Sequence, residues 1–519
     1  MLNKNRKLKN ERELQKAILR EKVKGTSDLE IGKRYGVTFR FIERLMTRLQ
    51  GVNVSSLKTA RRVKTLYPKD FKEEKTTVWS FKQRGNWATH SGEYRGNWSP
   101  YIPRNVILKY SREGETVLDY FCGAGTTAVE AKLLGRRWIA FDINDGAIKK
   151  AKENLDFEAE PKQKILFPGN LEPGQIYEPE LSVRDARDLS FLRKDSVDLI
   201  CAHPPYADII HYTDSEESDL SFFSIDEFLN EMSKVAKESH RVLKPGRQCA
   251  ILIGDTRKKR HVIPLGFKLI NVYLDAGFRL RELIIKRQHN CKTTGFWYAN
   301  SLKYNFLLLA HEYLPIFEKP IMPIFSNERD ELEGYSMGVP TLQRPVLKKK
   351  VDSYETTTVW IFPDKDFEER LNKNVVHRYS DGKAYPIITF VSQSKNGKDF
   401  GKERERKIGK LLLIKSPFLG NNSSSLNIEF YLQQMKEIVF QKLCKISEGG
   451  FIVIQTQDVR VDGYIEPLAK RLVDVLIYDN LWLKEIIIII QESSNSNVQN
   501  SEDYLTITHQ YLLVYEVKR

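Results

Sequence analysis

Residues 116–127 read TVLDYFCGAGTT, and this stretch decides the fold. An apolar strand ends there in a tight turn with Gly123 and Gly125, and a helix is expected over residues 127–134. Glycine is needed in such a turn because the backbone must approach a ligand closely and adopt torsion angles that other residues avoid. No third glycine follows in the dinucleotide-binding register, which disfavours NAD and FAD. The stretch predicts an α/β fold that binds a ligand at a strand end.

Three further strands are predicted, and each of them leads into residues that could take part in chemistry. The strand at 138–141 ends in Asp142, a carboxylate suited to the hydroxyl groups of a ribose. The next strand leads to Asp185, and the strand at 197–202 ends in the run HPPY at 203–206. Because ligands bind at the carboxyl ends of strands in open α/β sheets, the four strands together predict one binding site on a parallel sheet.

These motifs resemble those of the S-adenosylmethionine-dependent DNA methyltransferases that modify N6 of adenine or N4 of cytosine. Residues 119–125 are similar to the cofactor motif of that family, and residues 203–206 are similar to its catalytic Pro-Pro-aromatic motif. The block at 97–104 looks like the cofactor-binding segment before the first strand, and residues 242–246 resemble a later turn. The resemblance covers residues 76–318 and implies a Rossmann-like catalytic methyltransferase domain there.

The resemblance also implies roles for individual residues. The side chain at position 203 and the carbonyl of Pro204 would hold the target amino group, and Tyr206 would stack on the flipped base. Asp119 and Asp142 would hold the methionine and ribose parts of S-adenosylmethionine, and Asp185 its adenine amino group. No metal is expected, because the sulfonium already activates the methyl group. The predicted catalytic residues are His203, Pro204, Pro205 and Tyr206, and the predicted cofactor-binding residues are Asp119, Phe121, Gly123, Gly125, Thr126, Asp142 and Asp185.

Position 203 departs from the family's pattern. The family usually has Asp, Asn or Ser at this place, whereas this chain has His. A neutral imidazole has one acceptor nitrogen for an amino hydrogen, but a protonated imidazole has none. We therefore expect His203 to act in its neutral form, with activity falling below about pH 6. The same departure leaves the choice between adenine and cytosine open, and it is the feature that supports a catalytically silent protein as an alternative.

The first 70 residues carry most of the positive charge. They hold 19 Lys and Arg against 7 Asp and Glu, a balance of +12 within a total of +15. Such an excess suits a polyanion, because cations on phosphates release counterions. Three helical patterns joined by short turns are typical of a helix-turn-helix, with Arg40, Arg44 and Arg48 on one face. Residues 1–70 are predicted to be a basic DNA-binding domain with a linker, and a solvated tail without a partner is the alternative.

The C-terminal third repeats parts of the centre. Residues 357–360 match residues 76–79 at an offset of 281, and nine identities between residues 246–282 and 449–485 share one offset of 203. Such matches indicate a structural repeat. Residues 319–350, which contain four prolines and then three lysines, are predicted to be a linker between the copies.

The second copy lacks the predicted chemistry of the first. Phe81 and Gly246 are 165 residues apart, whereas their counterparts Phe362 and Gly449 are only 87 residues apart. No strand followed by Gly-x-Gly is predicted in the shorter interval, and KSPF at 415–418 replaces the Pro-Pro-Tyr motif. Residues 351–519 are therefore predicted to be a degenerate methyltransferase-like domain without a cofactor site. Its expected role is to pair with the first copy and to shape or read the nucleic acid.

Composition narrows the class of protein. Five scattered cysteines without a Cys-x-x-Cys pair disfavour a disulfide scaffold and a structural zinc site. No apolar run approaches the roughly 20 residues of a membrane span, and no secretory signal is recognised, so a cytoplasmic protein is expected. The leading hypothesis is a site-specific DNA amino-methyltransferase of a restriction-modification or phage-defence system. Its expected partners are double-stranded DNA and a cognate restriction endonuclease; an RNA base methyltransferase and a silent DNA-binding regulator are the alternatives.

Overall fold

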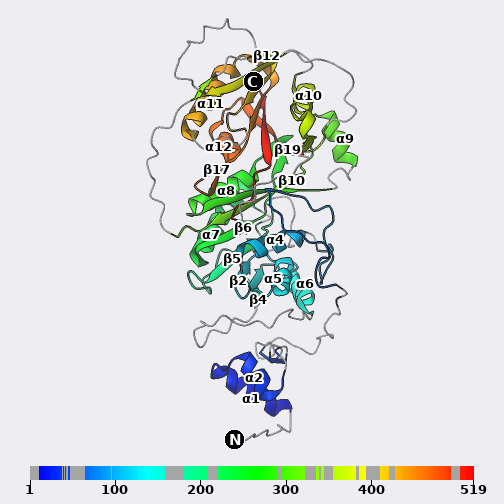
Figure 1. Cartoon of the computed structure of the whole chain (residues 1–519), viewed down its shortest axis with the longest axis vertical. Coiled ribbons are helices and arrows are strands. Elements are labelled where there is room, and N and C mark those ends of the chain that lie inside the picture. Colours follow the sequence, from blue (N-terminus) through cyan, green and yellow to red (C-terminus); the bar gives the residue numbers. More distant parts are fainter. Residues whose placement is uncertain are drawn as a thin grey trace.

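A computed structural model shows a mixed α/β chain with two large sheets (Figure 1). No helix among the residues that it describes is long and apolar enough to cross a membrane. The described residues are 11–37, 39, 41–42, 45–46, 63, 65–94, 96–157, 180–206, 220, 223–289, 295–321, 335–337, 341–343, 355–380, 385–392, 409–419, 427–492 and 503–519.

The first sheet has eight strands, most of them parallel. They are β1 (Val78–Trp79), β2 (Thr116–Asp119), β3 (Arg137–Asp142), β4 (Glu180–Val183), β5 (Val197–Ala202), β6 (Leu243–Ile251), β9 (Arg279–Arg287) and β10 (His311–Glu318). Their order is β1-β9-β10-β6-β5-β2-β3-β4, and only β10 runs antiparallel to its neighbours. The predicted parallel α/β sheet is confirmed, with the four predicted strands side by side at one end of the order.

Helices accompany this sheet, and together they form what we call the first unit. They are α4 (Tyr101–Tyr110), α5 (Thr126–Leu133), α6 (Asp145–Leu155), α7 (Ile225–Val242), α8 (Leu265–Asp275) and α9 (Gly295–Lys303). Helix α7 begins with a capping box, in which Ser224 and Glu227 satisfy each other's backbone N–H groups. Its apolar stripe, which includes Phe228, Met232 and Val235, is buried in the core of the unit.

The second sheet repeats the order of the first. Its strands are β11 (Tyr335–Met337), β12 (Thr341–Gln343), β13 (Val359–Pro363), β14 (Tyr385–Ser392), β15 (Gly409–Lys415), β16 (Ile446–Thr456), β19 (Leu481–Glu492) and β20 (His509–Val517). The order β13-β19-β20-β16-β15-β14 corresponds to β1-β9-β10-β6-β5-β2, with β20 antiparallel in the place of β10. Among the described residues, nothing in this sheet corresponds to β3 and β4, and this gap accounts for the shorter interval. The structural repeat predicted from the sequence is thus visible in the order of the strands.

This sheet and its helices form what we call the second unit. The helices are η3 (Asp364–Asp366), α10 (Phe367–Tyr379), α11 (Ile428–Leu443) and α12 (Leu468–Val475). Helices α10, α11 and α12 stand where α4, α7 and α8 stand in the first unit's chain order. The predicted domain limits at residues 76–318, 319–350 and 351–519 stay predictions.

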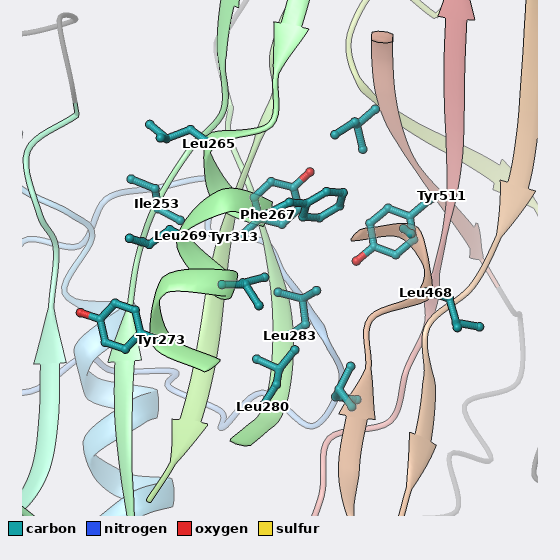
Figure 2. Close-up of a cluster of buried hydrophobic side chains, with 14 of the residues drawn as sticks. Ile253, Leu265, Phe267, Leu269, Tyr273, Leu280, Leu283, Tyr313, Leu468 and Tyr511 are labelled. Carbon is teal, nitrogen blue, oxygen red and sulfur yellow. The ribbon is translucent and has the colours of Figure 1, made fainter. Parts of the chain in front are cut away.

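One continuous apolar core joins the two units. Figure 2 shows Phe267 and Tyr313 of the first unit on the side that faces Tyr511 of the second, and the ring centroids of Phe267 and Tyr511 are 6.3 Å apart. Leu468 of α12 belongs to the same buried cluster. Burial of this kind is the main source of favourable free energy in association, so the units form one folded body.

The polar contacts between the units come in matching pairs. Arg257 pairs with Glu485, and their counterparts Arg460 and Glu282 pair with each other. Two hydrogen-bonded chains cross the interface in opposite directions; they are Thr358–His311–Tyr313–Asp255 and Thr77–His509–Tyr511–Asp458. A surface that meets its own equivalent in this way is typical of a two-fold dimer, so the chain has the interface of a dimer within one polypeptide.

The N-terminal described residues are helical. Helix α1 (Glu11–Val23) is followed by α2 (Asp28–Tyr35), whose first turn is capped by the side chain of Ser27. A small buried cluster holds these helices to helical residues further on; its members are Ile18, Ile31, Ile42 and Leu45. The predicted DNA-facing residues Arg40, Arg44 and Arg48 lie outside the described residues. The helix-turn-helix therefore stays a prediction.

Candidate active site

A cleft opens at the carboxyl ends of β2, β3, β4 and β5. The structure brings most of the predicted site residues together there. Six of them line the cleft: Phe121, Gly123, Asp142, Asp185, His203 and Pro205. The other five lie beside or beneath it: Asp119, Gly125, Thr126, Pro204 and Tyr206.

Both glycines of the turn after β2 are required by geometry. Gly123 and Gly125 have φ angles of 49° and 82°, in the left-handed region that disfavours side chains. A Cβ atom at Gly123 would lie 3.2 Å from the ring of Tyr94, and one at Gly125 would lie 3.1 Å from Cβ of Ala151. The turn is therefore pressed between the cleft and α6, and α5 begins directly after it at Thr126.

The two aspartates at the ends of β2 and β3 have different environments. Asp142 lines the cleft and accepts hydrogen bonds from the backbone N–H groups of Gly123 and Asn144, both at 2.9 Å. Asp119 is buried beneath the turn, where its carboxylate accepts the N–H of Phe121 at 3.1 Å. Burial raises the pKa of Asp119 to about 7. In this structure Asp119 positions the turn, whereas Asp142 presents its carboxylate at the cleft.

An ion-pair network holds Asp185 in place. Nε of Arg187 donates to both carboxylate oxygens of Asp185, at 2.9 and 3.0 Å. Nη1 of Arg187 also donates to Glu231 of α7 at 2.6 Å. Asp185 still lines the cleft, and a carboxylate has more acceptor positions than one arginine occupies. The network fixes this carboxylate at the cleft without closing it to a ligand.

The segment before α4 forms another wall of the cleft, and one buried carboxylate anchors it. Glu130 of α5 is fully buried and accepts hydrogen bonds from Trp87 at 2.7 Å and from Arg104 at 2.8 Å. His90 lies 2.7 Å from the same carboxylate. This anchor ties the segment to the helix that follows the glycine turn. The residues that the segment contributes to the cleft are Tyr94, Gly96, Asn97 and Trp98.

The HPPY motif after β5 is part of a polar network that local sequence does not predict. The hydroxyl group of Tyr206 donates to Glu312 at 2.6 Å, and Nε2 of His203 lies 3.3 Å from that hydroxyl oxygen. Lys286 donates to the other oxygen of Glu312 at 2.6 Å. Glu312 lies in β10 and Lys286 in β9, so only the pairing of distant strands brings them to the motif.

The environment of His203 favours the neutral imidazole. Its ring stacks on Trp98, with centroids 5.6 Å apart and an angle of 18° between the planes. Burial lowers the pKa of His203 to about 4, although the charge of Glu312 and a hydrogen bond with the backbone of Gly96 act in the opposite direction. This pKa lies below the pH of about 6 at which an imidazole in water becomes protonated, so the ring is expected to stay neutral to a lower pH than the sequence alone predicts.

The lowered pKa of His203 predicts how the rate of methyl transfer depends on pH. The acceptor nitrogen of His203 is present above the pKa and lost below it. The titration of this group should therefore change the rate of methyl transfer only near pH 4. We expect the ratio of the wild-type rate to the His203→Asn rate to stay constant from pH 8 to about pH 5 and to fall below that. Both proteins contain Asp119, so its titration affects the two rates alike and cancels in the ratio. A midpoint near pH 6.5 in the ratio would contradict the buried neutral ring.

The corresponding place in the second unit has different chemistry. Lys415 ends β15, where His203 follows β5, and its ammonium group pairs with Glu368 at 2.6 Å. Phe418 stands in the place of Tyr206, and it is fully buried against the ring of Tyr431. Gln510, the second residue of β20, replaces Glu312, the second residue of β10. The described part of the second unit thus keeps the counterparts of β5 and β10 but replaces the polar site residues that they position.

Two models of protein families match this chain. A model of the DNA methylase family matches residues 7–153 and 197–399, and a model of an RMKL-like methyltransferase domain matches residues 106–253. The first of these models covers more than half of the chain.

Single relatives match shorter segments. The type II methyltransferase M2.DpnII of Streptococcus pneumoniae is 38% identical over 79 residues, which are 15% of this chain and 28% of that protein. The type II methyltransferase M.MthZI of Methanothermobacter thermautotrophicus is 29% identical, over 28% of this chain and 46% of that protein. A tRNA (guanine(10)-N2)-dimethyltransferase from the same species is 32% identical, over 22% of this chain and 29% of that protein. The chain spans less than half of the length of each of these relatives.

Two solved structures are also similar to parts of this chain. A SAM-dependent methyltransferase of Methanosarcina mazei is 18% identical with a TM-score of 0.27, and the match covers 42% of this chain and 98% of that one. A putative DNA modification methylase of Thermus thermophilus, solved in complex with S-adenosyl-L-methionine, is 24% identical with a TM-score of 0.20. That match covers 28% of this chain and 54% of that one.

Proposed function

Since the chain belongs to the DNA methylase family, we propose that it transfers a methyl group from S-adenosylmethionine to an exocyclic amino group of a base in double-stranded DNA. One observation carries the proposal. A single cleft is lined by the glycine turn with Asp142 and Asp185 and also by His203 and Pro205 of the HPPY motif. A cofactor at the turn and a flipped base at the motif would therefore meet in one enclosed space.

The residues of the turn suit S-adenosylmethionine. Gly123 brings bare backbone to the cleft, where a Cβ atom would press against the ring of Tyr94. Asp142 presents an acceptor for ribose hydroxyl groups, and Asp185 presents one for an adenine amino group. When bound, the cofactor supplies a methyl group that its sulfonium activates for transfer. The second unit lacks the counterparts of β3 and β4 in its described part, so its strands offer no such acceptors.

This difference between the units predicts the binding stoichiometry. We expect isothermal titration calorimetry to show one equivalent of S-adenosylmethionine per chain. Asp142→Ala should abolish the binding, because it removes both the ribose acceptor and the hydrogen bonds that hold Gly123 and Asn144. Asp364→Ala, a change in the second unit, should leave it unaltered. Two equivalents per chain, or equal effects of the two substitutions, would contradict a cofactor site confined to the first unit.

The motif residues would act on the target amino group by holding its hydrogens. The carbonyl oxygen of Pro204 and the acceptor nitrogen of His203 take one hydrogen bond each, which directs the nitrogen lone pair toward the methyl group. Glu312 supports this arrangement, because the hydroxyl proton of Tyr206 is donated in a hydrogen bond to Glu312 at 2.6 Å. That proton is then not donated to Nε2 of His203, which keeps its acceptor position for the base.

The neutral form of His203 also suits the proton balance. The amino nitrogen gains a methyl group as the bond between sulfur and methyl carbon breaks, and it must then release one proton. A neutral imidazole in contact with the amino group can accept that proton and pass it to water. Lys286 favours the ionised form of Glu312, because its charge lowers the pKa of Glu312 against the opposing effect of burial.

A methyl-transfer assay tests the proposal. Full-length protein is incubated with S-adenosylmethionine labelled in the methyl group and with duplex DNA or duplex RNA. We expect label in DNA, and nucleoside analysis should place it on N6 of adenine or N4 of cytosine. Label in RNA alone would favour the alternative of an RNA methyltransferase, and label in neither polymer would favour a silent DNA-binding protein. Protection of the labelled DNA from a type II endonuclease would support a place in restriction-modification.

A further inference from the structure

Two hairpins of the same design occupy equivalent places in the interface between the units. The strands β7 (Thr256–Lys258) and β8 (His261–Ile263) are joined by Lys259 and Arg260, and β17 (Val459–Val461) and β18 (Tyr464–Glu466) by Asp462 and Gly463. Each hairpin contacts the sheet of the other unit, β8 against β19 and β18 against β9. The two turns can therefore be compared residue by residue within one chain.

The two turns share one backbone. Nη1 of Arg257 donates to the carbonyl oxygen of Arg260 at 3.0 Å, and Nη1 of Arg460 donates to that of Gly463 at the same distance. Positive φ angles occur at both central positions: 48° and 69° at Lys259 and Arg260, and 50° and 83° at Asp462 and Gly463. Two positive φ angles define the hairpin turn for which Asp-Gly is a preferred sequence.

Lys-Arg is an unfavourable sequence for this turn. A left-handed backbone is unfavourable for a residue with an ordinary side chain, whereas glycine adopts it freely and aspartate tolerates it. The first hairpin therefore carries strain that the second avoids. Backbone strain that persists in a folded chain is concentrated at functional sites. The presence of Lys and Arg in this strained turn therefore indicates a function for their side chains.

Available space explains the glycine of the second turn but not the cations of the first. A Cβ atom at Gly463 would lie 2.5 Å from the hydroxyl oxygen of Tyr504. Phe306 takes the place of Tyr504 in the first unit, since Arg257 stacks on Phe306 as Arg460 stacks on Tyr504. Phe306 has no hydroxyl group, so a side chain fits at position 260. Nothing in this packing requires that side chain to be basic.

The first turn is the centre of an exposed basic patch, which we call the turn patch. It consists of Lys258, Lys259, Arg260 and Lys303, all exposed. The guanidinium of Arg260 lies 3.8 Å from the ring centroid of Tyr304, and the ammonium of Lys303 lies 5.1 Å from the same centroid. Within the described part of the chain, none of the four cations forms an ion pair with a carboxylate. Unpaired cations gathered on one surface suit phosphates.

The turn patch belongs to the unit and the sheet edge that carry the proposed chemistry. β7 begins just beyond the carboxyl end of β6, and β6 is the neighbour of β5, which leads into the HPPY motif. Between β6 and β7, Gly254 lies against Tyr206, since a Cβ atom there would be 3.4 Å from the tyrosine ring. The equivalent turn of the second unit has no lysine or arginine at its two central positions.

From this comparison we propose that the turn patch contacts the phosphate backbone of the duplex whose base enters the cleft. The inference rests on the proposed DNA methylation, and it names a surface outside the cofactor and base site. Contacts of this kind set the position of the duplex and carry no sequence information. Asn or Asp followed by Gly would give a relaxed turn without positive charge. Lys259 and Arg260 give a strained turn with two positive charges, and these charges are the reason that the strain is retained.

The test replaces the strained turn by a relaxed one in the full-length chain. Lys259→Asn combined with Arg260→Gly removes two charges, and it introduces the Asn-Gly sequence that this turn prefers. We expect the thermal unfolding midpoint to stay or to rise. Binding of fluorescein-labelled duplex DNA, measured by anisotropy at several salt concentrations, should weaken, and the slope of log K against log salt should become shallower by about 2.

A matched control removes two charges elsewhere. Lys237 and Lys436 are exposed lysines on α7 and α11, and Lys237→Gln with Lys436→Gln should leave both affinity and slope unchanged. The inference would be overturned if the turn variant and the wild type had equal salt slopes, or if the control variant lost as much affinity as the turn variant. Neither result would contradict the proposed methyl transfer. Wild-type protein that neither binds nor methylates duplex DNA would instead overturn the proposed function, and the inference with it.

Discussion

His203→Ala is expected to lose methyl transfer to DNA by a factor of about 100 to 1,000, while its affinity for S-adenosylmethionine stays within a few-fold of wild type. The loss follows because the substitution removes one of the two groups that hold the target amino hydrogens, and a single positioned hydrogen-bonding group at a reacting centre is typically worth that factor in rate. The cofactor contacts proposed for Asp142 and Asp185 are untouched. Initial rates with labelled cofactor and a calorimetric titration measure the two quantities.

His203→Asn is the matched control for this change. Asparagine is one of the residues that the family uses at this position, and its amide oxygen is an acceptor without a titrating proton. We expect His203→Asn to keep most of the rate, because the acceptor is replaced rather than removed. An alanine variant that is as active as the asparagine variant would mean that the side chain at position 203 does not hold the base. A loss of cofactor binding in both would assign His203 to the cofactor site instead.

Those parts of the site that local sequence determines could be predicted. The turn at Gly123 and Gly125 needs left-handed backbone, and Asp142 and Asp185 follow directly on strands, so each is visible within a few residues. Glu312 and Lys286 were missed, because they reach Tyr206 only through the antiparallel pairing of β10 with β6 and β9. A carboxylate 106 residues away in the chain has no local pattern that marks it as a partner of the motif.

The repeat predicted a second sheet but not how the two sheets meet. Asp255 and Asp458 are among the repeated identities, and each accepts a hydrogen bond from a tyrosine in the buried interface. Glu282 and Glu485 are another repeated pair, and each binds an arginine of the other unit. Charged residues at repeated positions were a signal of the interface, because a polar group that is buried in both copies needs a partner that is repeated as well.

The interface also explains how the second unit can support the candidate site of the first. Oγ1 of Thr358, in the second unit, accepts the backbone N–H of Ala310 at 3.0 Å and lies 2.9 Å from Nδ1 of His311. These residues lead directly into β10, where the next residue is Glu312. The second unit thus holds the start of the strand that supplies the partner of Tyr206. Disturbing the interface should therefore lower activity as well as stability.

Glu485→Ala is expected to destabilise the chain by about 3–5 kcal/mol, because it removes the buried counter-charge of Arg257, a side chain that is itself only 13% exposed. The side chain of Glu485 is 1% exposed, Nη2 of Arg257 lies 2.6 Å from it, and the N–H of Leu307 donates to it at 3.0 Å. Leu307 precedes β10 by four residues, so the loss should spread to Glu312 and reduce methyl transfer. Urea unfolding and initial rates measure the two effects.

The two-fold interface supplies the controls for this prediction. Glu282→Ala should cost about as much, because Glu282 is fully buried, binds Arg460 and accepts the N–H of Leu505 at 3.1 Å. Glu180→Ala breaks an exposed pair with Arg184 and should cost less than about 1 kcal/mol. Replacing both members of one pair, by Arg257→Met with Glu485→Leu, should cost far less than Glu485→Ala alone, because no charge is left unpaired. If the double variant is as unstable as the single one, the destabilisation comes from lost packing, and the buried charge is not its cause.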